Sequence, residues 1–115
     1  MLKILIVEDE LHNREAISEI ISRLNHTVEI AVNGKEALEK AVTSDFDLIL
    51  SDIRMPVMDG ITLFDSFSSF NQNKQRKTKF AFMTAYGRME EAVDLMKRGA
   101  LHFLTKPLRK KDIIQ

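Results

Sequence analysis

Short apolar runs alternate along this chain with longer stretches in which apolar residues recur every three or four positions. The runs expected to form strands are residues 2–7, 27–31, 47–51, 80–83 and 101–104. The stretches expected to form helices are residues 11–24, a segment beginning at Asn33-Gly34, residues 61–70 and a segment beginning near residue 88. The two spacings are those of buried strands and amphipathic helices, so the pattern predicts repeated strand–helix units.

The character of the strands predicts the fold class. Strands that are almost continuously apolar belong to parallel sheets covered by helices on both faces. Residues 27–31 alternate only weakly, which favours an edge position. With right-handed crossovers, this favours an α/β, doubly wound, five-stranded parallel sheet in the flavodoxin-like order 2-1-3-4-5. Residues 108–115 leave barely two turns, so we expect the last helix to be truncated. The length of 115 residues predicts a single domain over residues 1–115.

The helical spacing also predicts which residues face the core. These are Ile17, Ile20, Ile21 and Leu24, then Ala37, Leu38, Ala41 and Val42, then Ile61, Phe64 and Phe67, and finally Met89, Ala92, Val93 and Met96. Arg14 and its neighbours Glu15 and Ser18 fall on the polar side of the first helix. Gly99 stands where a helix C-cap is expected, and Asp59-Gly60 is interpreted as a turn with a capping role.

Charge and composition narrow the class of partner. Lys plus Arg and Asp plus Glu number 17 each, so the formally neutral chain lacks long-range attraction to nucleic acid or anionic membranes. We therefore predict no direct nucleic acid binding and no membrane association. The absence of cysteine excludes disulfides and thiolate metal sites. The sequence contains no membrane span or signal-peptide layout, which predicts a cytoplasmic location.

Polar side chains follow four of the predicted strands. They are Glu8 and Asp9 after the first strand, Asp52 after the third, Thr84 after the fourth and Lys106 after the fifth. The carboxyl ends of parallel strands share one edge of a sheet, so these groups should converge there. Three carboxylates and one ammonium repel on balance, so either some carboxyls stay protonated or a divalent cation lies among them.

Mg²⁺ suits such a cluster best, because it takes oxygen ligands and keeps open positions for phosphoryl oxygens. Zn²⁺ is disfavoured because no His or Cys stands at a strand end. A carboxylate beside a metal, facing Thr84 and Lys106, is suited to phosphoryl transfer onto Asp52. Glu8 and Asp9 could also cap the first helix, and the two roles are compatible.

Four stretches carry a resemblance to a known family. They are "LIVEDE", "DLILSDIRMPVMDG", "FMTAYG" and "FLTKP", which in this order resemble receiver domains of two-component response regulators over essentially the whole chain. The resemblance implies that Asp52 accepts a phosphoryl group from a sensor histidine kinase. It also implies that Mg²⁺ is held by Glu8, Asp9, Asp52 and the backbone carbonyl of Arg54.

The resemblance further implies a signalling switch rather than an enzyme, one that assists its own phosphorylation and dephosphorylation. Lys106 would bind phosphate, Thr84 would be the switch hydroxyl and Phe103 the switch aromatic. The face of the fourth helix, fifth strand and fifth helix would serve a possible homodimer. The chain would be the N-terminal part of a longer regulator, and "TAYG" is similar to receivers attached to transcription activators.

Three other functions fit parts of the pattern. A phosphatase of the haloacid dehalogenase type needs a second Asp two residues after the nucleophile, where this chain has Arg54. A flavin-binding electron carrier needs a phosphate-cradling loop after the first strand, which the sequence does not provide. The third is an interaction module that keeps the fold but is never phosphorylated. The presence of the acidic pair Glu8-Asp9 together with Asp52, Thr84 and Lys106 argues against it.

Overall fold

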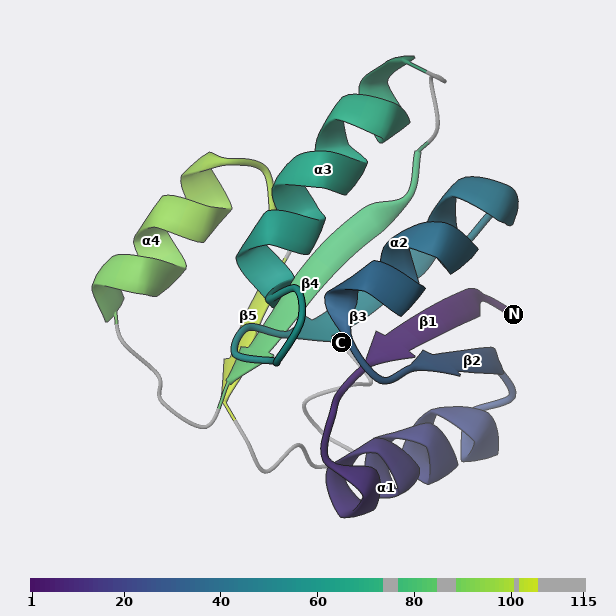
Figure 1. Ribbon diagram of the computed structural model, residues 1–115. Helices are drawn as coiled ribbons and strands as arrows, with labels where there is room; N and C mark the ends of the chain where they lie inside the picture. The colour runs from purple at the N-terminus through teal and green to yellow at the C-terminus, as the bar shows by residue number, and fades with distance from the viewer. Residues whose placement is uncertain (74–76, 85–88, 101, 106–115) are drawn as a thin grey trace.

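Parallel strands form one five-stranded sheet in the order β2-β1-β3-β4-β5 (Figure 1). The computed structural model describes residues 1–73, 77–84, 89–100 and 102–105. Its strands are β1 (Lys3–Val7), β2 (Thr27–Ala31), β3 (Leu48–Asp52), β4 (Lys79–Thr84) and β5 (His102–Thr105). The predicted fold class, strand order and edge position of β2 are confirmed. The last helix, expected after residue 107, lies outside the described residues.

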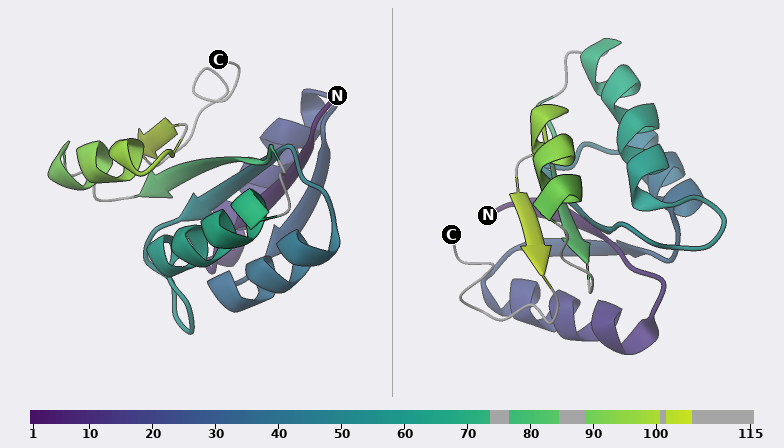
Figure 2. Two further views of the ribbon diagram at one scale, coloured as in Figure 1. Left: turned by 90° about the horizontal axis from the view of Figure 1, so that it is seen from above. Right: turned by 90° about the vertical axis from the view of Figure 1, so that its left-hand side faces the viewer.

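Helices cover both faces of this sheet. They are α1 (Leu11–Arg23), α2 (Gly34–Thr43), α3 (Gly60–Asn73) and α4 (Met89–Lys97). Figures 1 and 2 show α1 on one face and the neighbouring helices α2 and α3 on the other. Coverage of both faces explains why the strands are apolar along almost their whole length.

Strand β1 shows how the sequence divides between the two cores. Ile4 and Ile6 pack on the side of α1, in a cluster with Ile17. Leu5 and Val7 belong to the opposite cluster, under α2 and α3. Successive side chains of a strand point to opposite faces, so one apolar run supplies both cores. β1 is therefore anchored on both sides, and the residue that follows it has a fixed position.

The core beneath α3 is aromatic. Phe64 of α3 makes edge-to-face contacts with Phe80 and Phe82 of β4, with ring centroids 5.0 and 5.4 Å apart. Phe64 and Phe67 are buried, as predicted, and Leu63 beside them is fully buried as well. Such aromatic pairs add about 0.5–1.5 kcal/mol each beyond the burial of their surface. They fix α3 against the strand that leads to Thr84.

The predicted inner face of α4 is wrong in part. Val93 and Met96 are 45% and 43% exposed, whereas Leu95 is fully buried. The chain returns to the core at Ala100, whose N–H donates to the Leu95 carbonyl at 3.1 Å. This bond closes the end of the helix, and Leu95 and Ala100 are the buried residues there. The side chains of Met89 and Ala92 lie outside the described residues.

Helix ends are fixed by the expected residue types, with one correction. Gly99 has a φ of +106°, which confirms the predicted C-cap. Asp59 Oδ1 accepts the Thr62 N–H at 2.8 Å, which confirms its capping role. The N-cap of α1 is Glu10, whose carboxylate accepts two backbone N–H groups of the first turn. Capping by Glu8 or Asp9 is therefore wrong, because the helix begins later than that interpretation required.

Val57, in the loop between β3 and α3, has an unusual backbone conformation. Its φ is +72°, a region that β-branched residues rarely adopt, and its side chain is 76% exposed. Strain of this kind costs about 1–3 kcal/mol. We expect Val57→Asn to raise the free energy of unfolding in urea by about 1 kcal/mol, since Asn tolerates positive φ. Val32→Asn, at an exposed position without positive φ, should not, and equal effects of the two changes would contradict this explanation.

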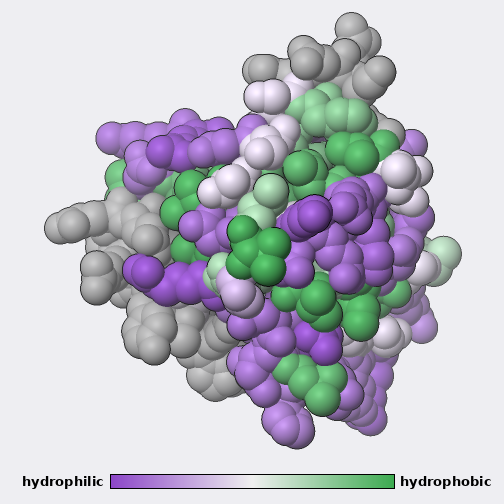
Figure 3. Space-filling view, viewed as in Figure 1, coloured by the Kyte–Doolittle hydropathy of each residue, from purple (hydrophilic) through white to green (hydrophobic). Residues whose placement is uncertain are grey.

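The exposed edge of β2 is partly covered. Lys40 of α2 donates from Nζ to the Ile30 carbonyl, which occupies one acceptor of the edge strand. Ile30 and Leu11 are nevertheless about half exposed. On the face drawn in Figure 3, hydrophobic residues lie in small patches between hydrophilic ones. Among the described residues, no helix combines the length and apolar character needed to cross a bilayer.

Candidate functional site

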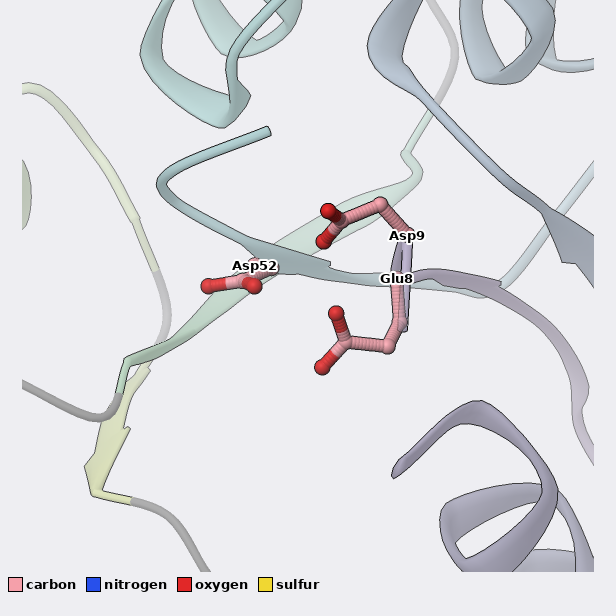
Figure 4. Close-up of side chains that lie close together, drawn as sticks. All are labelled: Glu8, Asp9 and Asp52. Atoms are coloured by element: carbon pink, nitrogen blue, oxygen red, sulfur yellow. The ribbon is translucent and has the colours of Figure 1, made fainter. Parts of the chain in front are cut away.

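Three carboxylates meet at the carboxyl edge of the sheet. Glu8, Asp9 and Asp52 each offer an oxygen, and these oxygens all lie within 4.8 Å of one another. Figure 4 shows the three side chains turned toward a common space, two from the end of β1 and one from the end of β3. Glu8 is fully buried, Asp52 is 7% exposed and Asp9 is exposed. The predicted convergence of these residues is confirmed.

Strand register explains the convergence. Val7 of β1 lies opposite Ser51 of β3, so the residues that follow them, Glu8 and Asp52, are brought side by side. The Glu8 N–H donates to the Ala31 carbonyl at 3.1 Å, which extends the pairing with β2 by one residue. The two buried carboxylates are thus placed by three anchored strands rather than by a loop.

Backbone donors orient the buried carboxyl groups. The Ile53 N–H donates to Asp52 Oδ1 at 2.8 Å, and the Glu10 N–H donates to Glu8 Oε2 at 3.2 Å. A buried carboxylate without such partners would be strongly unfavourable. These donors do not cancel the repulsion among three acidic groups in so small a space, so the cluster remains suited to a cation.

The loop after Asp52 folds back onto the end of β3. The Gly60 N–H donates to the Ile53 carbonyl at 2.8 Å, and a Cβ at residue 60 would lie only 2.1 Å from the Asp52 carbonyl oxygen. The Gly34 N–H in turn donates to the Met58 carbonyl at 3.0 Å. Gly60 therefore has a steric role at the site. The sequence pattern indicates only a turn with a capping role at Asp59-Gly60 and does not predict this.

Thr84 ends β4 on the same edge of the sheet. Asp52 lies opposite Met83 in register, so Thr84 stands one residue beyond the acidic side chain on the neighbouring strand. It is 1% exposed, a buried hydroxyl near the cluster. Lys106 and the side chain of Phe103 lie outside the described residues. Arg54 is exposed in the loop after Asp52, and the role of its carbonyl stays a prediction.

One contact to the acidic pair was not anticipated. Arg14, which the helical pattern placed on the polar side of α1, donates from Nη1 to the Glu8 carbonyl at 2.9 Å. Sequence periodicity assigns a residue to a face but not to a backbone atom of a neighbouring turn. No signal in a single sequence would have found this contact.

The donor set fits Mg²⁺. Among the described residues, the cluster offers only carboxylate oxygens, and two of its three residues are buried. Mg²⁺ is the hard cation that binds through one or a few carboxylates and retains water. Open coordination positions could then receive phosphoryl oxygens. The arrangement is thus able to hold a divalent cation beside a buried carboxylate, and phosphoryl transfer to a carboxylate requires these two groups together.

Comparisons with known proteins agree with this geometry. The model of the response regulator receiver domain matches residues 4–115. The transcriptional regulatory protein ZraR of Klebsiella oxytoca is 38% identical over 105 residues, which cover 91% of this chain and 23% of ZraR. The chemotaxis protein CheY4 of Vibrio cholerae superposes with a TM-score of 0.88 at 32% identity, covering 99% of this chain and 93% of that one.

A further solved structure contains a metal. The response regulator TrrA of Thermotoga maritima, determined in complex with Mg²⁺ and BeF, has a TM-score of 0.81 and 28% identity. The match covers 99% of this chain and 94% of TrrA. By contrast, the chain spans about a quarter of the length of ZraR. This chain therefore matches almost the whole of CheY4 and TrrA, but only one part of ZraR.

Proposed function

The chain belongs to the response regulator receiver domain family, and on that basis we propose that Asp52 is its phosphoacceptor. The observation that carries this proposal is the approach of the Glu8, Asp9 and Asp52 oxygens to within 4.8 Å of one another. Asp52 is the member on the central strand β3, with Glu8 and Asp9 on one side and Thr84 on the next strand. That position would allow Asp52 to share the metal with the two other carboxylates and to attack phosphorus with a carboxylate oxygen.

The proposed reaction forms a P–O bond to a carboxylate oxygen of Asp52 and breaks the P–N bond of a phosphohistidine. The electron pair of the broken bond remains on the imidazole nitrogen of the donor. Asp52 is held by the Ile53 N–H on Oδ1, which fixes the orientation of its carboxyl group. Glu8, Asp9, Asp52 and the carbonyl of Arg54 would hold Mg²⁺, which when bound would offset charge on the phosphoryl oxygens.

Two residues would complete the site. Lys106 would contact the phosphoryl group, and Thr84 would donate its hydroxyl to it. Phosphorylation adds negative charge beside Asp52, and the movement of Thr84 toward it would bias a two-state switch that includes Phe103. The protein would thus act as a switch that assists its own phosphorylation and dephosphorylation.

The partners follow from the family. Receiver domains take phosphoryl groups from sensor histidine kinases, so such a kinase is the proposed donor. We also propose a homodimer through the face of α4, β5 and the helix predicted after residue 107, where exposed Val93 and Met96 supply apolar surface on α4. The relative ZraR is described as a transcriptional regulatory protein, and a transcriptional output of a longer protein is proposed here by analogy.

The proposal is tested by incubating the chain with acetyl phosphate, with and without Mg²⁺. We expect the intact mass to rise by one phosphoryl group only when Mg²⁺ is present, and peptide mapping to place the group on Asp52. Continuous release of phosphate from many phosphoesters would indicate a hydrolase instead. No mass change with either acetyl phosphate or a histidine kinase domain would indicate an interaction module that is not phosphorylated.

A further inference from the structure

Arg14 joins the second turn of α1 to the backbone of the acidic pair. Its Nη1 donates to the carbonyl of Glu8 at 2.9 Å and to that of Asp9 at 3.4 Å. The helix itself is fixed at this point, because the Arg14 N–H donates to the carbonyl of the N-cap Glu10 at 3.0 Å. The guanidinium thus connects an anchored helix to the turn that presents two of the three carboxylates.

The two acidic residues depend on this contact to different degrees. Glu8 is also held by the bond from its N–H to Ala31 and by the bond from the Glu10 N–H to its carboxylate. Asp9 is exposed and lies two residues beyond the last strand pair of β1. The Glu8 carbonyl, which Arg14 also holds, belongs to the peptide unit that joins Glu8 to Asp9, so rotation of that unit would move the backbone and side chain of Asp9.

We propose that Arg14 is a positioning residue for the metal site, holding the backbone of Glu8 and Asp9 so that both carboxylates stay turned toward Asp52. This inference rests on the proposed metal site and extends it to a residue that does not touch the ion. Partners of this kind behind a metal ligand change metal affinity when they are replaced, commonly by 10-fold to 100-fold.

Charge and geometry predict opposite results at this position. Arg14 is a cation near the cluster, so by charge alone its removal should make the site more negative and Mg²⁺ binding tighter. By geometry its removal frees the turn between β1 and α1, so Mg²⁺ binding should weaken. The sign of the change therefore shows which effect dominates.

Two substitutions separate these effects further. Arg14→Met retains an apolar stem for the groove between α1 and β2, which Arg14 lines together with Leu11 and Ile30, but removes the donor and the charge. Arg14→Lys retains the charge but replaces the planar guanidinium by a compact ammonium, which does not reproduce its donor geometry. If the fixed backbone matters, both variants should bind Mg²⁺ about tenfold more weakly than the wild type.

The experiment is a Mg²⁺ titration of each folded protein, followed by the amide NMR signals of residues 8–10. Arg23→Met is the matched control, since Arg23 lies at the far end of α1 and pairs only on the surface with Glu19 among the described residues. It should bind Mg²⁺ like the wild type. Urea unfolding of the same proteins, without metal, separates loss of stability from loss of affinity.

The outcomes distinguish the two proposals. The positioning role is supported if the wild-type protein binds Mg²⁺ saturably and both Arg14 variants bind it more weakly. Equal or tighter binding by Arg14→Met would overturn it and leave the metal site intact, as would a loss of stability with unchanged affinity. A wild-type protein without a saturable response to Mg²⁺ would overturn the metal site and this inference together.

Discussion

Asp52→Asn is expected to abolish phosphoryl uptake from acetyl phosphate and, at the same time, to make the metal-free protein more stable. An amide has the shape of the carboxylate but is not a nucleophile toward phosphorus. Its Oδ1 can still accept the Ile53 N–H that now reaches Asp52 at 2.8 Å. The substitution therefore removes the chemistry and one negative charge while the local hydrogen bond is retained.

The gain in stability follows from the crowding of charge. Three carboxylates lie within 4.8 Å of one another, and two of them are almost fully buried. Removing one relieves repulsion in a region of reduced dielectric, which should raise the free energy of unfolding by about 1–2 kcal/mol. A cluster of charges that lowers the stability of the metal-free protein but can bind a cation is typical of a functional site, not of residues that stabilise the fold.

Urea unfolding with and without Mg²⁺ measures both effects. The wild type should gain about 2.7 kcal/mol at a Mg²⁺ concentration one hundred times the dissociation constant, and Asp52→Asn should gain much less at that concentration. Asp59→Asn is the control, because Asp59 caps α3 in the same loop and Asn caps equally well. It should be phosphorylated normally. Phosphorylation of Asp52→Asn at the wild-type rate would refute the assignment of the phosphoacceptor.

The fold and the acidic cluster were predictable for the same physical reason. A parallel sheet buried on both faces needs strands such as residues 4–7 and 48–50, which are apolar without interruption. Where such a strand ends, the first polar side chains stand at one common edge. The positions of Glu8, Asp9 and Asp52 therefore followed from the strand ends, without knowledge of any distance.

Features that depend on the direction of a side chain were harder to predict from the sequence. In α4 the apolar spacing did not reveal that Leu95 is buried while Val93 and Met96 are exposed, because apolar residues occur on more than one side of this short helix. Likewise, the cap at Glu10 depends on where α1 begins. Tertiary packing determines which face of a helix is buried and where the helix begins, and a single sequence encodes that packing only indirectly.

Gly60→Ala is expected to cause the largest loss of stability of any conservative change near the site. A Cβ at this position would lie 2.1 Å from the Asp52 carbonyl oxygen and 3.0 Å from the Cα of Ile53, both backbone atoms. No side-chain rotation relieves such an overlap, so α3 must move away from β3 or the Asp52 backbone must shift. Ala would gain about 1 kcal/mol in helix propensity, but overpacking against backbone should exceed this and leave a net loss of about 3 kcal/mol.

The change should also weaken the site, because the displaced backbone is that of Asp52 itself. Urea unfolding and a Mg²⁺ titration of Gly60→Ala should therefore change together. Gly99→Ala is an informative contrast, since Gly99 has a φ of +106° but no atom within 4 Å of an added Cβ. It should cost only the backbone strain of about 1–2 kcal/mol and leave Mg²⁺ affinity unchanged. If Gly60→Ala were as stable as the wild type, the close approach of α3 to the end of β3 could not be what fixes the position of Asp52.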